Sequence, residues 1–364
     1  MEKSIKIERH LYISPVKRLV AGCLISSLIF SGCKKGSAGD DTGLPDPPKT
    51  PETELNTPGT PAVVKEGDFS IAVLPDTQYY TAVKNGGTMD MFTAQINWIK
   101  ANQVKENIAY VAHLGDITDH GDDPRTAFNE WYPARTAMYG LENPVSIPYG
   151  LAVGNHDQFP SQYPLTGTTT YYNRYFGAKH FEGRPYYGGH YSNNNDSHYD
   201  LFTAGGIDFI VIYIEYDAFN EDQTNMNTWA YDLLGVYSSR KAIIVSHYLI
   251  GNNGTAGTNQ GTPGAWRSQG QTMYNRLKSR PNLFMMLCGH VGDNGEGYRE
   301  EVFEGRTVRI FLSDYQSRPN GGDGIMRLYT ISPSKNQIGV RTFSPFTNTA
   351  ETDGDSQFTV PLFN

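Results

Sequence analysis

The sequence Ile108-Ala-Tyr-Val-Ala-His-Leu-Gly-Asp116 is an apolar run that ends abruptly on a carboxylate. A continuous apolar run of this kind, without polar alternation, predicts a strand buried on both faces. Four more apolar runs end on a metal-binding residue: 71–75 before Asp76, 149–154 before Asn155, 242–246 before His247, and 283–289 before His290. Buried strands in layered α/β proteins present ligand-binding residues at their carboxyl ends. Asp, Asn and His gathered there predict a divalent-metal site.

The pattern around these runs predicts the rest of the architecture. Helices are expected over 88–106, after Asp123, and over 224–236 and 266–280. Strands are expected at 198–203 and 207–215, and successive hairpin strands over 297–344. Residues 158–200 are rich in Tyr, Gly and Asn and are expected to form a long excursion. Mixed strands and helices that end in consecutive strands predict two stacked sheets flanked by helices.

Composition limits the class of partner. The chain has 364 residues, is 38% hydrophobic and carries a formal net charge of -8. This length and apolar content suffice for a large core. An acidic balance argues against a nucleic-acid polymer as partner, because phosphate backbones are bound by basic surfaces. A small phosphate ester remains compatible, since bound metal would meet its charge.

The N-terminal segment predicts export and a lipid anchor. Residues 1–33 place Lys17-Arg18 before an apolar run that is too short to span a bilayer. Ser31-Gly-Cys33 then resembles a bacterial lipobox, so Cys33 is the expected lipidation site; an uncleaved membrane anchor is the alternative. The expected location is the bacterial cell envelope, at the outer membrane or cell surface, with the membrane as a partner through Cys33.

A linker and one domain are expected after this segment. Residues 34–66 are rich in Pro and Thr and poor in aromatic residues, which predicts a disordered linker. Residues 67–364 form the predicted globular domain. Cys288 is the only cysteine after Cys33, so this domain has no intrachain disulfide and Cys288 is expected to be a buried apolar residue.

The motifs that follow the strands resemble a known family. Their order is Asp76, Gly115-Asp-Ile-Thr-Asp119, Gly154-Asn-His-Asp157, His247 and Gly289-His290. Each motif alone is an ordinary strand end, but in this order they resemble the calcineurin-like metallophosphoesterases over roughly 69–345. The segment 74–78, Leu-Pro-Asp-Thr-Gln, resembles a bacterial subgroup whose first motif carries Gln. The resemblance implies an α/β fold, a four-layer α/β/β/α sandwich of two mixed sheets flanked by helices.

The resemblance also implies a role for each motif residue and one or two divalent ions of the manganese, iron or zinc type. Asp116 would bridge two ions. Asn155, His247 and His290 would complete the shell of one ion, and Asp76 with the Gln78 amide would hold the other. His156 would protonate the leaving oxygen or steady charge on the phosphoryl group. Asp119 would hydrogen-bond His156 and keep it protonated.

Two positions depart from the family pattern. The first motif has Gln78 where the family has His, and Gly292 stands where the last motif has a second His. Both missing imidazoles belong to the ion of Asp76, so that site is expected to be weak and oxygen-rich. Metal analysis should then find one tight ion and a second only at high added metal. Asp293 or Glu296 is a candidate to compensate.

Several residues near the motifs are candidates for either a binding role or a structural role. Tyr79 and Tyr80 follow the first motif and are the best-placed aromatic residues to bind substrate; aromatic packing is the alternative. His113 alternates away from Asp116 and is expected to be a core histidine. The segment 314–324, with Asp314-Tyr-Gln316 and a glycine-rich turn, either shapes the pocket rim or is a plain hairpin.

Together these features predict a metal-dependent phosphoesterase that hydrolyses a phosphate mono- or diester by metal-activated hydroxide. The expected substrate is a small phosphate ester. One alternative is a non-catalytic binding lipoprotein on a decayed phosphoesterase fold, motivated by the lost ligands. A second alternative keeps the metal site but hydrolyses another kind of bond.

Overall fold

The structure is a computed structural model, which describes residues 59–160, 167–219, 222–254, 257–258 and 263–364. The predictions for 1–33, including lipidation of Cys33, and for the linker over 34–58 lie outside the described residues. Within those ranges, no helix combines the length and the apolar character that crossing a membrane requires.

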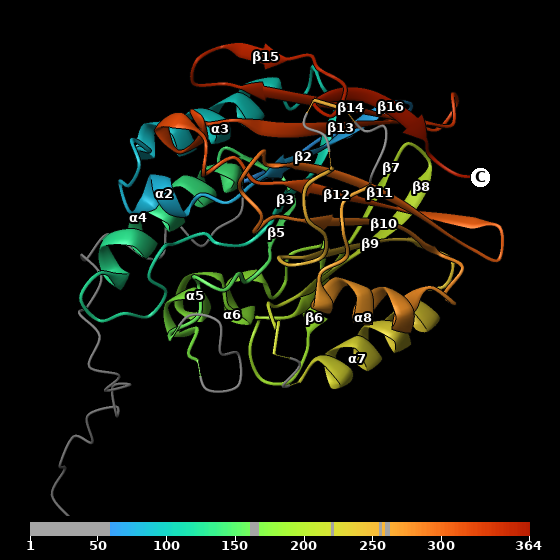
Figure 1. The fold of residues 1–364 in the computed structure, drawn as a ribbon, viewed down its shortest axis with the longest axis horizontal. Helices are drawn as coiled ribbons and strands as arrows, with labels where there is room; N and C mark the ends of the chain where they lie inside the picture. Colours follow the sequence, from blue (N-terminus) through green and yellow to red (C-terminus); the bar gives the residue numbers. More distant parts are fainter. Residues whose placement is uncertain (1–58, 161–166, 220–221, 255–256, 259–262) are drawn as a thin grey trace, which may run out of the picture. The chain divides into compact units, whose positions relative to one another are not determined.

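One sheet contains the first three predicted strand ends. Its order is β15-β14-β13-β2-β3-β5, and β16 pairs with β14 (Figure 1). The parallel strands at its centre carry the apolar runs, and β13 joins β2 in antiparallel register. The strands are β2 (Phe69–Leu74), β3 (Ile108–His113), β5 (Tyr149–Leu151), β13 (Met326–Ser332), β14 (Gln337–Ser344), β15 (Thr349–Glu351) and β16 (Gln357–Pro361).

The other large sheet contains the last two strand ends. Its order is β11-β12-β10-β9-β8-β7-β6, with β8, β9, β10 and β12 parallel to one another. The remaining strands pair antiparallel at the two edges. The strands are β6 (Tyr187–His190), β7 (His198–Ala204), β8 (Ile207–Ile214), β9 (Lys241–Ser246), β10 (Leu283–Cys288), β11 (Glu296–Phe303) and β12 (Arg306–Ser313).

Helices cover the outer face of each sheet, and an apolar core fills the space between the sheets. Ring contacts such as Phe92 with His113 and Trp98 with Phe343 pack α3 on the first sheet. Apolar residues of α7 and α8, such as Met226 and Met273, pack on the second sheet. The predicted α/β architecture of two mixed sheets flanked by helices is therefore confirmed. The helices are α2 (Gln78–Thr81), α3 (Met89–Asn102), α4 (Ala127–Tyr139), α5 (Thr170–Phe176), α6 (Ala178–Phe181), α7 (Gln223–Val236) and α8 (Ser268–Leu277), with 3-10 turns η1 (Gly140–Glu142) and η2 (Pro319–Gly322).

Two segments differ from the sequence prediction. The expected excursion over 158–200 contains α5, α6 and β6, and its Tyr171 and Tyr172 are buried. Tyr172 contacts Trp131 edge-to-face, so these aromatic residues extend the core. The predicted linker also ends earlier than residue 66, because β1 (Thr60–Pro61) pairs with β4 (Val145–Ser146) and backbone hydrogen bonds tie it to the domain.

Candidate metal centre

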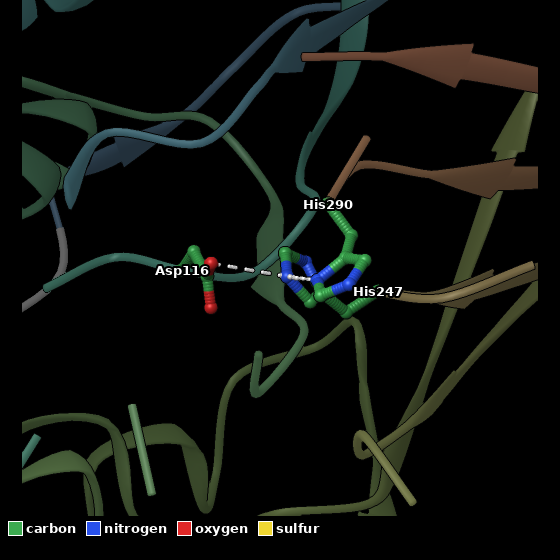
Figure 2. Close-up of side chains that lie close together, drawn as sticks. All are labelled: Asp116, His247 and His290. Carbon is green, nitrogen blue, oxygen red and sulfur yellow. Dashed lines mark hydrogen bonds and ion pairs between the residues drawn. The ribbon is translucent and has the colours of Figure 1, made fainter. Parts of the chain in front are cut away.

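The five predicted residues lie just beyond the carboxyl ends of their strands. Asp76, Asp116 and Asn155 follow β2, β3 and β5 of one sheet, while His247 and His290 follow β9 and β10 of the other. Figure 2 shows Asp116, His247 and His290 turned toward a common point from these separate strands. The site is thus assembled from both sheets.

Four side chains form a continuous set of donor atoms. The Asn155 Oδ1 lies 2.8 Å from the His290 Nδ1, and that nitrogen lies 3.2 Å from the His247 Nε2. The His247 Nε2 in turn lies 3.2 Å from the Asp116 Oδ2. Donor atoms about 2.1 Å from one ion and at right angles to each other lie about 3 Å apart. The amide, imidazole and carboxylate donors therefore fit a transition-metal ion.

Neighbouring groups hold these candidate ligands in place. The Leu114 carbonyl lies 2.9 Å from the His247 Nδ1, which leaves the Nε2 for the site. The backbone N–H of His156 donates to the Asp116 Oδ1 at 2.9 Å. Burial opposes ionisation of Asp116, but His247 and His156 outweigh it and hold the pKa of Asp116 well below its usual range. This carboxylate is therefore charged and able to bind a cation.

Glycines allow the ligand loops to approach one another. A Cβ on Gly154 would lie 2.2 Å from the Asp116 Oδ1, and a Cβ on Gly289 would lie 2.1 Å from the Asp76 Oδ1. The ligands themselves are strained, because Asp116 has φ 49° and His290 has φ 76°. A side chain at position 154 or 289 would therefore clash with a carboxylate of the neighbouring loop.

The Asp76 side of the site has a different donor set. Asp76 is 2% exposed, and its Oδ2 accepts a hydrogen bond from the His290 backbone N–H at 3.1 Å. Burial and the nearby carboxylates of Asp314 and Asp116 raise the pKa of Asp76. The Gln78 Nε2 donates to the Asp116 Oδ2 at 3.0 Å, while the buried Gln78 Oε1 has no hydrogen-bond partner. That oxygen would be a suitable ligand atom for a second ion.

Asp157, to which the sequence assigned no role, joins two of the ligand loops. Its Oδ1 accepts hydrogen bonds from the backbone N–H groups of Ile117 at 2.9 Å and Thr118 at 3.0 Å. Its Oδ2 accepts from the Gly154 N–H at 2.9 Å. The loops after β3 and β5 are therefore fixed to each other beneath the metal ligands. The sequence alone does not indicate this role for Asp157, because its partners Ile117 and Thr118 lie in another loop.

His156 lies beside the ligands and is paired with Asp119. The His156 Nδ1 lies 2.8 Å from the Asp119 backbone carbonyl and 3.2 Å from its Oδ1. Burial disfavours the charged imidazole, but Asp116 and the contacts with Asp119 raise the pKa of His156 to about 9. The expected pairing is present, although the hydrogen bond goes to the backbone carbonyl. Lys84 was not predicted; its Nζ donates to the Asp119 Oδ2 at 2.9 Å and balances that carboxylate.

The aromatic residues at the site are not those expected. Tyr80 is 1% exposed and its hydroxyl accepts a hydrogen bond from the Gly324 N–H, so its assignment to substrate binding is corrected to core packing. Tyr79 is half-buried and lies under the Lys84 ammonium at 4.7 Å. The rings beside the ligands are Tyr216 and Tyr248, at 5.6 and 4.6 Å from the His290 ring. Tyr248 directly follows His247 in the sequence, and this adjacency could have identified it as a residue of the site.

The remaining expectations near the site are resolved by burial and pairing. Glu296 does not compensate for the missing imidazoles, because its Oε1 accepts from the buried Arg327 guanidinium at 2.6 Å. Asp293 is exposed. His113 is a buried histidine whose Nε2 lies 3.0 Å from the Thr77 Oγ1, as expected for the core. Cys288 is buried and free.

Comparisons with known proteins agree with this description. The profile of the calcineurin-like phosphoesterase family matches residues 69–316. The chain is similar to YvnB, an uncharacterised protein of Bacillus subtilis, with 32% identity over 290 residues. That match covers 76% of this chain, which spans only 20% of YvnB.

Two solved structures are also similar. GAP50, described as the anchor in the inner membrane complex of Plasmodium, matches at 12% identity with a TM-score of 0.44, covering 80% of this chain and 90% of that one. The sulfate thiohydrolase SoxB of Thermus thermophilus matches at 10% identity with a TM-score of 0.41, covering 79% of this chain and 59% of that one.

Proposed function

Because this chain belongs to the calcineurin-like phosphoesterase family, we propose that it is a metal-dependent hydrolase of small phosphate mono- or diesters. The observation that carries the proposal is the joined set of Asn155, His290, His247 and Asp116 donor atoms beside His156. When bound, divalent ions would supply Lewis acidity to the phosphoryl group and an activated water as nucleophile.

The protein's own groups would position the reactants and move one proton. His156 is held by Asp119 through its Nδ1, so its Nε2 would be the atom that faces a substrate. Its raised pKa keeps the imidazole protonated near neutral pH. It would therefore donate a proton to the leaving oxygen, or hold a positive charge beside the phosphoryl oxygens. Lys84 fixes the charge on Asp119 from the other side.

The pairing of His156 also weighs against a purely binding protein. A decayed site that only held a cation would have no need for a protonated imidazole next to its ligands. The family match also supports a hydrolase, since the matched residues 69–316 include every motif from Asp76 to His290.

Chelation tests the proposal directly. The purified protein should hydrolyse p-nitrophenyl phosphate or bis-p-nitrophenyl phosphate, lose that activity in chelator, and recover it with manganese, iron or zinc. Phosphate release should be compared with cleavage of a sulfate ester and a carboxyl ester. Full activity in chelator would contradict the proposal. A metal-loaded protein that cleaves none of these esters would support the non-catalytic alternative, and one that cleaves only the other esters would support the second alternative.

We also propose that Cys33 carries a lipid that holds the domain in the cell envelope, as the lipobox-like sequence indicates. In a bacterial host, the protein should fractionate with membranes and incorporate labelled fatty acid. Cys33→Ala should remove the label and release the protein from the membrane fraction. A Cys33→Ala protein that still incorporates fatty acid would contradict this assignment.

A further inference from the structure

A sixth strand end, that of β12, lies beside the end of β10, one of the five strand ends recognised in the sequence. β12 (Arg306–Ser313) pairs in parallel with β10, and the last aligned pair is Cys288 with Leu312. Two residues further along each strand lie His290 and Asp314. Asp314 therefore leaves the sheet on the same edge as the candidate ligands His247 and His290, and it is fully buried at 0% exposure.

Asp314 contacts the same turn as Asp76. In the turn after β10, Gly289 lies against the Asp76 carboxylate, and the His290 N–H donates a hydrogen bond to it. At its other end, a Cβ built on Gly292 would lie 2.2 Å from the Ser317 Oγ and 3.4 Å from the Asp314 Oδ2. The segment that contains Asp314 thus occupies the space that a side chain at position 292 would need.

A chain of amide groups joins Asp314 to Asp116. The Gln316 Nε2 donates to the Asp314 Oδ2 at 3.2 Å, and the Gln78 Nε2 donates both to the Gln316 Oε1 and to the Asp116 Oδ2. This uses the donors of Gln78 and leaves its Oε1 without a partner, on a side chain that is 1% exposed. An unpaired buried oxygen among carboxylates is a feature that a bound cation would satisfy.

Among the described residues, no lysine or arginine forms an ion pair with this group of carboxylates, Asp76, Asp116 and Asp314. The ion-pair partners of Asp76 and Asp116 are histidine. Burial and mutual repulsion disfavour the charged forms of three neighbouring carboxylates, and a cation among them would favour those charged forms. This condition differs from that of Glu296, whose buried charge is met by Arg327.

We propose that Asp314 is a ligand of the second ion and that, with Asp76, Asp116 and the Gln78 amide oxygen, it forms an all-oxygen cation site. This inference rests on the proposed metal-dependent function. It adds a ligand to the ion site that lacks the two imidazoles of the family motif. An all-oxygen set favours hard ions such as Mn²⁺ or Mg²⁺ over Zn²⁺. The nitrogen-containing set of Asn155, His247 and His290 favours Zn²⁺ or iron. The two sites therefore bind different kinds of ion.

Metal binding is the direct test. Chelator-treated full-length protein is first loaded with one equivalent of Zn²⁺ and then titrated with Mn²⁺, with free Mn²⁺ followed by electron paramagnetic resonance. The unaltered protein should bind about one further equivalent of Mn²⁺. Asp314→Asn should weaken this binding by about tenfold to a hundredfold or more, and leave the Zn²⁺ equivalent in place. Asp293→Asn, an exposed carboxylate next to Gly292, is the matched control and should bind Mn²⁺ as the unaltered protein does.

Three outcomes decide the inference. Unchanged Mn²⁺ affinity in Asp314→Asn would overturn it. If Asp314→Asn does not fold, as judged by circular dichroism, Gln78→Leu removes the proposed amide ligand, and it must weaken the same Mn²⁺ equivalent for the inference to stand. Hydrolysis of p-nitrophenyl phosphate is measured in parallel. A protein that binds both ions but cleaves no phosphate ester would refute the proposed function and leave the ligand assignment intact.

Discussion

His156→Ala is expected to lower kcat/KM for a phosphate ester by about 10²–10⁴-fold, while the bound metal stays unchanged. The imidazole is positioned by Asp119 and not by the ligand set, since its Nδ1 contacts the Asp119 carbonyl and carboxylate. Its removal should therefore take away the proton donor without opening the metal centre. Steady-state kinetics on metal-loaded protein, together with metal analysis, measure both quantities.

The choice of substrate separates the two roles proposed for His156. If it protonates the leaving oxygen, the loss in His156→Ala should be large for phenyl phosphate and much smaller for p-nitrophenyl phosphate, whose leaving group needs no proton. If it holds charge on the phosphoryl oxygens, both substrates should lose similar activity. His190→Ala, on β6, is the matched histidine control and should retain activity. Undiminished activity in His156→Ala with both substrates would remove His156 from the mechanism.

Asp116→Asn is expected to lower activity by about a thousandfold or more, because metal ions supply several kcal/mol of transition-state stabilisation and about 1.4 kcal/mol corresponds to tenfold. Its Oδ2 lies 3.2 Å from the His247 Nε2 and 3.0 Å from the Gln78 Nε2, between the two donor sets. Both metal sites should therefore weaken together, as measured by elemental analysis after dialysis.

The matched control for this change is Asp208→Asn. The Asp208 side chain lies on β8 and is 51% exposed. This variant makes the same carboxylate-to-amide change at a position away from the candidate ligands. It should keep metal and activity. If Asp116→Asn retained the full metal content and turnover, the assignment of this carboxylate as the shared ligand would be wrong, even though the fold is confirmed.

Much of this architecture could be predicted because the strands are short apolar runs that end on polar residues. That signal alone predicts Asp116 and His247 as residues at strand ends, because the apolar composition of β3 and β9 indicates strands buried on both faces. Helix α3 was predicted for a similar reason, because Phe92, Ile96 and Ile99 recur at helical spacing and are all buried.

What could not be predicted depends on strand order. Asp314 also follows an apolar run, but the role proposed for it requires β12 to lie beside β10, and the hairpin of β11 and β12 conceals this neighbour in the sequence. The same limit applies to Tyr216, which reaches His290 only because β8, β9 and β10 are neighbours. Tyr80 was misassigned because adjacency to a motif does not determine which side of a short helix faces the core.

The division of the candidate ligands between the two sheets has a thermodynamic consequence. Asp76, Asp116 and Asn155 belong to one sheet, and His247, His290 and Asp314 to the other, so a cation held by both groups would act as a cross-link between the layers. Since the unfolded chain cannot assemble that set, unfolding would have to release the ion. Conformational stability would then rise with free metal, by about 2.7 kcal/mol at a hundred times the dissociation constant, and the melting temperature would follow metal supply in the surroundings.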